Sequence, residues 1–147
     1  MICRLQELVA LAQERPPTRV AIAAAAHKLV LQSVQRAVNL GIVVPLLVGR
    51  EEDIRHEAAA IGWELGDEAI VPTATNTASA AAAVSLVRDG EADVVMKGYL
   101  HTDERLRAVL RSDAGLRTDR LLSHVFVLEV PTYHKLLLIS DAAININ

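Results

Sequence analysis

The sequence predicts an α/β protein built on a mostly parallel sheet with helices on both faces. Four apolar segments are centred near Val20, Val44, Ile70 and Val94, at spacings of 24, 26 and 24 residues. Between them lie segments with apolar residues at helical spacing, which is the pitch of successive strand–helix units. The segments do not repeat one another's residues, which excludes a solenoid. Because such crossovers are right-handed, we expect the carboxyl ends of all four strands at one rim.

The composition is that of a globular chain with an aliphatic core. Of the 147 residues, 52% are hydrophobic and 3% are aromatic, which argues against disorder. The formal net charge of −3 gives no general attraction to nucleic acid or to an anionic membrane. Cys3 is the only cysteine, which excludes an internal disulfide and fits a cytoplasmic protein. No apolar run reaches the ~18 residues of a membrane helix, and the N-terminus does not have the order of a secretory signal.

The local patterns place each element. A first helix is expected at residues 3–14, and Pro16-Pro17 ends it. Strands are expected at residues 19–23, 43–48, 68–71 and 93–96, and helices at residues 27–40, 51–61 and 75–88. A glycine follows each of these three helices as a cap. Pro45 favours a strand start or a sheet edge over a central position.

The pattern changes after Thr118. Residues 123–130 and 135–140 are expected to be strands, and a four-residue link between them permits a hairpin but not a helical crossover. We therefore expect the sheet to become mixed at this end. The chain stops on the apolar segment 141–147, without a closing helix, so we expect a piece of a longer protein.

The chemistry is expected between residues 94 and 124. An apolar run ends at Lys97-Gly98, at the carboxyl end of a strand, and Thr102 is a good N-cap for the helix that follows. Lys97 would point an ammonium into the rim, and Gly98 would let a ligand approach the backbone. Alternatively, the two are a surface lysine and a tight turn. Cations beside a helix start suit an anionic ligand, and four arginines follow: Arg107, Arg111, Arg117 and Arg120.

Each of these cations has a second interpretation. Asp103 and Glu104 put negative charge on the first helical turn, which disfavours phosphate at that N-terminus. Arg107 lies four residues after Asp103, so a solvated ion pair explains it as well. Arg117-Thr118 could clamp a phosphate, or the two could belong to a surface loop after a helix stop at Gly115.

Other candidates are weaker. Ser123 and His124 are strand neighbours that point to opposite faces and cannot pair with each other, so a structural role is favoured. Lys28, which follows His27 after the first strand, opposes the dipole of the next helix, whereas the uncharged helix start at residues 75–77 is a cleaner anion site. The five histidines show no metal-ligand spacing, and the glycine-rich phosphate-loop motifs are absent.

Four strings in this order resemble the phosphate acetyl/butyryl transferase family, and most of all its phosphate butyryltransferase branch. They are Met96-Lys97-Gly98, Gly115-Leu116-Arg117-Thr118, Ser123-His124-Val125 and residues 140–145. The resemblance covers residues 18–147 and is specific only after Asp93. It implies that residues 1–147 form a single domain, similar to the first domain of isocitrate dehydrogenase, and that a second domain is absent.

The resemblance also implies a reaction and a site. Family members move an acyl group between coenzyme A and inorganic phosphate, which requires two anions to be held together and the developing oxyanion to be stabilised. Coenzyme A is then a substrate, and no cofactor is bound. The residues that would bind substrate are Lys97, Gly98, Thr102, Arg107, Arg117, Thr118, Asp141 and Asn145.

Two departures from the family bear on activity. Lys28 stands where relatives usually carry an acidic residue, and the family's serine and aspartate thought to act in catalysis lie beyond Asn147. We therefore expect the chain alone to be inactive or weakly active. An alternative is a non-enzymatic module that binds coenzyme A, phosphate or a partner. A related decarboxylating dehydrogenase would need clustered acids for Mg²⁺, which Asp141 alone does not supply. An open sheet edge predicts self-association into a homo-oligomer.

Overall fold

The computed structural model describes residues 2–66, 69–99, 108–111, 113–116, 118–120 and 122–142. The chain divides into two compact units, which are described separately. The larger unit is residues 17–117, and the smaller unit combines residues 1–16 with residues 118–147. A single domain over the whole chain stays a prediction.

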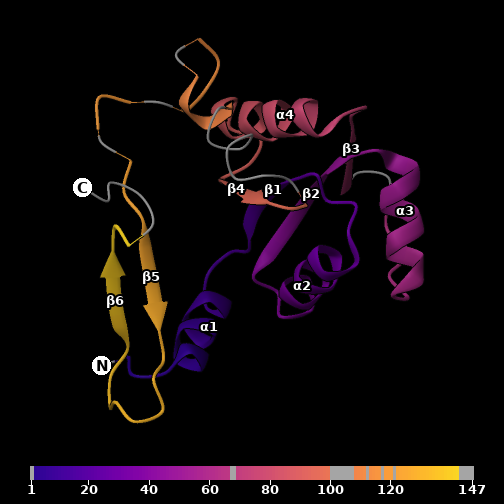
Figure 1. Cartoon of the computed structure of the whole chain (residues 1–147). Coiled ribbons are helices and arrows are strands. Elements are labelled where there is room, and N and C mark those ends of the chain that lie inside the picture. The colour runs from indigo at the N-terminus through magenta and orange to yellow at the C-terminus, as the bar shows by residue number, and fades with distance from the viewer. Residues whose placement is uncertain are drawn as a thin grey trace. The chain divides into compact units, whose positions relative to one another are not determined.

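The larger unit is a four-stranded parallel sheet with helices on both faces, as predicted. Its strands are β1 Thr18–Ala23, β2 Val43–Gly49, β3 Ile70–Pro72 and β4 Val94–Lys97, in the spatial order β3-β2-β1-β4. Its helices are α2 Lys28–Asn39, α3 Glu51–Ala60 and α4 Asn76–Arg88. Figure 1 shows α4 on one side of the sheet and α2 on the other. Gly41, Gly62 and Gly90 follow the three helices with positive φ, as expected of caps.

Strand β1 shows how one segment serves two cores. Successive side chains point to opposite faces, so Val20 and Ile22 pack with apolar residues of α2 and α3, while Ala21 and Ala23 pack with α4. All four are buried, which is why this strand reads as a continuous apolar run. Burial on both faces holds β1 in the centre of the sheet and fixes where its carboxyl end lies.

Pro45 lies on a strand that is internal in the sheet order, contrary to the prediction of a start or an edge. β2 pairs with β1 over its first six residues, and Pro45 is opposite Val20. Within the described residues, however, β3 pairs only with Leu47, Val48 and Gly49. Proline has no N–H to donate, and Pro45 lies in the half of β2 that the described part of β3 does not pair with.

Arg19 and Asp93 clamp the amino ends of β1 and β4 together. Arg19 Nη2 is 2.7 Å from Asp93 Oδ1 and Arg19 Nε is 3.1 Å from Oδ2, so the pair is bidentate. The backbone N–H of Arg19 also donates to Oδ2, over 3.0 Å. The side-chain hydrogen bond and then the backbone hydrogen bond from Arg19 lower the pKa of Asp93 below its usual value.

This clamp predicts a pH-dependent stability. Because the pKa of Asp93 is lower in the folded chain, its contribution is fully present above the unfolded pKa and is lost as pH falls through the folded pKa. We expect Asp93→Asn to lower the urea midpoint of the larger unit, and the difference from wild type to shrink from about pH 6 to about pH 3. The fluorescence of Trp63, the only tryptophan, reports this transition. A difference that stays constant over this range would contradict the assignment.

The smaller unit contains helix α1 Leu5–Gln13 and a hairpin of β5 Val125–Leu128 and β6 Leu137–Ser140. The two strands are antiparallel, with Val125 opposite Ser140 and Leu128 opposite Leu137, which confirms the predicted hairpin. The expected mixed sheet is wrong for the described residues, because β5 and β6 pair only with each other and form a separate two-stranded sheet.

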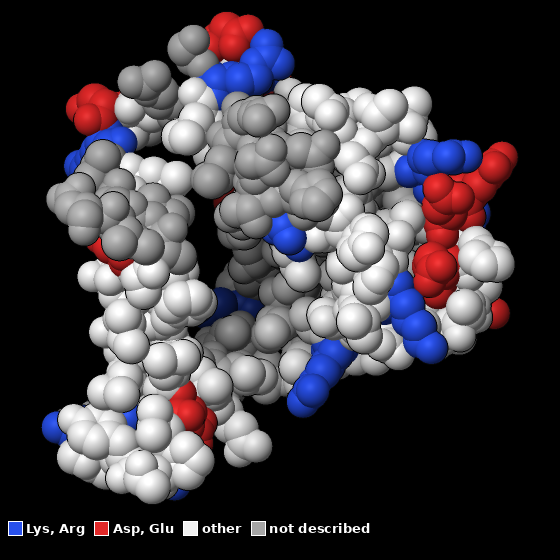
Figure 2. Space-filling view, viewed as in Figure 1, with Lys and Arg blue, Asp and Glu red and all other residues white. Residues whose placement is uncertain are grey.

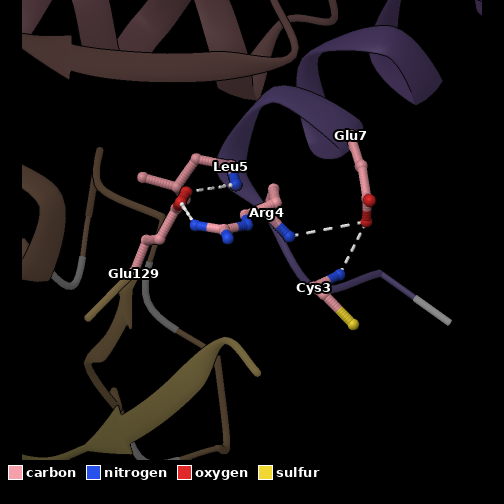
Figure 3. A network of polar contacts seen from close by, with 5 residues as sticks. All are labelled: Cys3, Arg4, Leu5, Glu7 and Glu129. Atoms are coloured by element: carbon pink, nitrogen blue, oxygen red, sulfur yellow. Dashed lines mark hydrogen bonds and ion pairs between the residues drawn. The ribbon is translucent and has the colours of Figure 1, made fainter. Parts of the chain in front are cut away.

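Glu129 joins this hairpin to the start of α1 (Figure 3). Its carboxylate accepts hydrogen bonds from Arg4 Nη1 over 2.8 Å and from the backbone N–H of Leu5 over 2.9 Å. A carboxylate at a helix N-terminus satisfies a free N–H and complements the helix dipole. The bond from Arg4, and then the bond from Leu5, lower the pKa of Glu129. A residue far along the chain thus caps the first helix.

The hairpin strands are apolar on both faces. Val125, Phe126, Val127 and Leu128 are all exposed, and Leu138 is 72% exposed. Neither strand carries a charged residue. An isolated two-stranded hairpin is only marginally stable in water, so this ribbon is the feature that supports the expected self-association.

Candidate functional site

The carboxyl ends of the four parallel strands form one rim of the larger unit. In the strand register, Ala23 lies opposite both Val48 and Lys97, and Gly49 lies opposite Pro72. Residues that directly follow these strands are therefore neighbours in space although they are far apart in sequence. In open α/β sheets this rim is where ligands bind.

Lys97 is on this rim, as predicted. It is the last residue of β4 and is half-buried beside Ala23. No carboxylate pairs with its ammonium among the described side chains. Figure 2 shows the described Lys and Arg side chains scattered over the visible face and not gathered in one patch.

Gly98 is buried where the chain leaves β4. Its N–H donates to the carbonyl oxygen of Ala23 over 2.8 Å, and the N–H of Tyr99 donates to that of Ala24 over 2.9 Å. A Cβ at Gly98 would collide with these same two carbonyl oxygens. The missing side chain of Gly98 thus lets its backbone pack closely against the end of β1, which fits the interpretation of a tight turn. A ligand at the Gly98 backbone stays a prediction.

The loop after β1 is held in an unusual conformation. Ala24 has φ 54°, in the left-handed region that residues with a Cβ rarely adopt, and is buried. Hydrogen bonds on both sides hold it there, from Tyr99 N–H to the Ala24 oxygen and from Ala25 N–H to the Val48 oxygen. Strain of this kind persists where the surrounding structure over-determines it, and it is often found at functional sites.

His27 and Tyr99 stack on one another at the rim. Their ring centroids are 4.3 Å apart and the rings are 6° from parallel, so the turn after β1 and the turn after β4 are joined by an aromatic contact. The Nδ1 atom of His27 is buried and has no hydrogen-bond partner among the described residues. Tyr99 remains 65% exposed.

A small cavity opens beside Tyr99. It has a volume of about 140 Å³, and its lining comes from the residues that follow β1, β2, β3 and β4. The polar residues of the lining are Arg50, Asp53, Thr75, Asn76, Ser79 and Tyr99. Ser79 is buried, and its hydroxyl is 2.6 Å from that of Thr73, which ties the loop after β3 to α4. Thr75 precedes the first residue of α4 and caps the helix by accepting a hydrogen bond from the N–H of Ala78.

The charged side chains that line this cavity are of opposite sign and form an ion pair. Arg50 Nε is 3.3 Å from Asp53 Oδ2. Glu51, Glu52 and Asp53 all lie in the first turn of α3. The helix start at residues 75–77, predicted as a clean anion site, therefore shares a cavity with a carboxylate. The carboxylate disfavours an anionic ligand in this cavity, whereas a polar but uncharged ligand group is suited to the cavity.

The other predicted substrate-binding residues lie either outside the described residues or in the smaller unit. Thr102, Arg107, Arg117 and Asn145 lie outside the described residues. Thr118 and Asp141 belong to the smaller unit, where their side-chain oxygens accept backbone N–H groups, from Arg120 over 3.1 Å and from His124 over 3.2 Å. Their role in binding stays a prediction.

Sequence reasoning missed Arg50, Asp53 and Tyr99. Arg50 directly follows β2, Asp53 lies in the first turn of α3, and Tyr99 lies two residues after β4. All three are therefore near a strand end, which is the signal that singled out Lys97. Among the described residues, no group of three or more His, Cys, Asp or Glu could hold a metal ion. None of the described helices combines the length and apolarity that a membrane span needs.

The fold and the rim together define an α/β protein with a candidate ligand site at the carboxyl edge of a parallel sheet. The sequence profile of the Phosphate acetyl/butaryl transferase family matches residues 67–147, which is more than half of the chain. The chain belongs to this family, as its residues had indicated.

Individual relatives agree with this family. A phosphate acetyltransferase of Rhizobium meliloti is 41% identical over 143 residues, covering 97% of this chain and 45% of the relative. A phosphate butyryltransferase of Clostridium acetobutylicum is 37% identical over 145 residues, covering 99% and 48%. The chain thus spans about half the length of these relatives.

Solved structures are similar as well. A branched-chain phosphotransacylase from Enterococcus faecalis V583 matches with a TM-score of 0.65 and 28% identity, covering 88% of this chain and 44% of that one. A phosphotransacetylase from Streptococcus pyogenes matches with a TM-score of 0.61 and 17% identity, which supports the fold alone. The predicted α/β fold is therefore confirmed.

Proposed function

We propose that this chain takes part in transferring an acyl group between coenzyme A and inorganic phosphate, with Lys97 holding an anionic substrate at the sheet rim. The observation that carries the proposal is the position of Lys97 at the carboxyl edge of a parallel sheet in a member of this family. Because the chain spans about half of its relatives, the activity of a whole relative is for this chain a proposal.

The chemistry requires anions to be brought together. A phosphate oxygen attacks the thioester carbonyl, the carbon–sulfur bond breaks, and the departing thiolate of coenzyme A takes up a proton. Positioning the two reactants supplies a large part of such a rate enhancement, and a fixed cation lowers the repulsion between them. Lys97 is the described candidate for that cation, and Arg107 and Arg117 are proposed to assist it.

Calorimetric titration of the purified chain tests the role of Lys97. We expect inorganic phosphate or coenzyme A to bind, and Lys97→Met to weaken that binding about tenfold, because a charge-assisted hydrogen bond is lost. Lys135→Met, an exposed lysine in the smaller unit, is the matched control. Equal binding by both variants would refute the assignment. The same titration on Arg117→Ala tests the second cation.

Turnover distinguishes an enzyme from a binding module. Formation of acyl phosphate from butyryl-CoA and phosphate is expected to be weak with this chain alone, and robust formation would contradict that expectation. Binding without turnover would favour the non-enzymatic alternative. We also propose a cytoplasmic location, which the lone cysteine supports, and self-association, which sedimentation equilibrium at high concentration would detect.

A further inference from the structure

We propose that the cavity beside Tyr99 binds a nucleoside, with the base stacked on the Tyr99 ring. The inference deepens the proposed function and rests on it in one respect, because the nucleoside in question is the adenosine of coenzyme A. Three observations carry it: an aromatic platform, a cavity of limited size, and polar groups that suit a neutral ligand.

Tyr99 is a preformed stacking platform. One face of its ring lies on His27, with centroids 4.3 Å apart, and its backbone N–H is bonded to the Ala24 oxygen over 2.9 Å. The residue is nevertheless 65% exposed and lines the cavity. Because the stack on His27 and the hydrogen bond already hold Tyr99, the residue loses little freedom when a base stacks on its ring, and such stacking contributes substantially to binding.

The size of the cavity limits what can enter it. Pockets that enclose drug-sized ligands have volumes of about 300–1,000 Å³, whereas this cavity has about 140 Å³. It can therefore accept part of a nucleoside, such as its base, and not the whole of coenzyme A. The rest of a larger ligand would lie along the open rim, where Lys97 is the last residue of β4.

Polar groups of the lining favour a nucleoside over a phosphate. The side-chain amide of Asn76 offers both donors and an acceptor, which is the combination that pairs with the edge of adenine. The Asp53 carboxylate can accept hydrogen bonds from ribose hydroxyls but repels a phosphate. Arg50 is paired with Asp53, so its charge is already partly neutralised.

Titration calorimetry with adenosine tests this assignment in the full chain. Adenosine has neither a phosphate nor a thioester, so its binding reports on this subsite and not on the reaction. We expect adenosine to bind and ribose 5-phosphate to bind much more weakly. Tyr99→Leu should weaken adenosine binding about tenfold, while Tyr99→Phe, which keeps the ring, should retain it. Tyr133→Leu, the other tyrosine, is the matched control and should bind as wild type.

Several outcomes would overturn the inference. They are no adenosine binding at millimolar concentration, equal binding by Tyr99→Leu and wild type, and tighter binding of ribose 5-phosphate than of adenosine. If Tyr99→Leu does not fold, Asn76→Ala at the exposed start of α4 replaces it, with the same expected loss. If adenosine does not bind but phosphate binding still depends on Lys97, this inference alone is refuted. If adenosine binds but phosphate binding does not depend on Lys97, the proposed function alone is refuted.

Discussion

Gly98→Ala is expected to destabilise the larger unit by about 3 kcal/mol, because the added methyl group would collide with backbone atoms, which cannot move aside as a flexible side chain can. The atoms in its way are the carbonyl oxygens of Ala23 and Ala24, which are backbone atoms of the central strand and the loop after it. Relieving the collision requires β1 and the turn after β4 to separate. That movement would also break the two hydrogen bonds that place Lys97 and Tyr99 at the rim.

Gly49→Ala is the matched control for Gly98→Ala. Gly49 ends the neighbouring strand, but a Cβ there would first meet Ile54 Cδ1 at 3.2 Å, the far end of a flexible side chain. We expect a loss below about 1 kcal/mol for this variant. Urea unfolding followed by Trp63 fluorescence compares the two. Similar losses for both variants would show that the backbone contact at Gly98 does not carry the effect.

Leu31→Ala is the second large effect, with an expected loss of about 3 kcal/mol. Leu31 on α2 is fully buried among the residues that cover one face of the sheet, including Ile22 and Leu47. Truncation removes apolar contacts and leaves a cavity that the flanking helices and sheet cannot fully close.

The same helix provides the control for Leu31→Ala. Leu29 lies two residues earlier and is 66% exposed, so the same substitution there should change the stability by less than about 0.5 kcal/mol. The measurement is again urea unfolding reported by Trp63. A loss at Leu29 that equals the loss at Leu31 would mean that α2 packs on the sheet through a different face from the one described.

Much of the site could be predicted from the sequence because strand ends are local signals. The run Val94–Lys97 followed by Gly98 indicates a strand that stops at a cation, and the parallel pitch then places that cation at a rim. The same argument could have found Tyr99 and Arg50, which also follow strands. What no local pattern contains is the stack of Tyr99 on His27, because these residues are brought together by the pairing of β1 with β4.

The sequence by itself determined the element types, the spacing of strand–helix units that indicates a parallel sheet, and the family. Apolar periodicity, glycine caps and short motifs each depend only on residues that are close in the sequence. Only the tertiary structure decided that Gly98 fits against β1, that Glu129 caps the first helix, and that a carboxylate shares the cavity at the α4 start. It also decided that the hairpin forms a sheet of its own. These features depend on which distant segments pair, and pairing is set by how buried faces fit together and not by the local pattern of either segment.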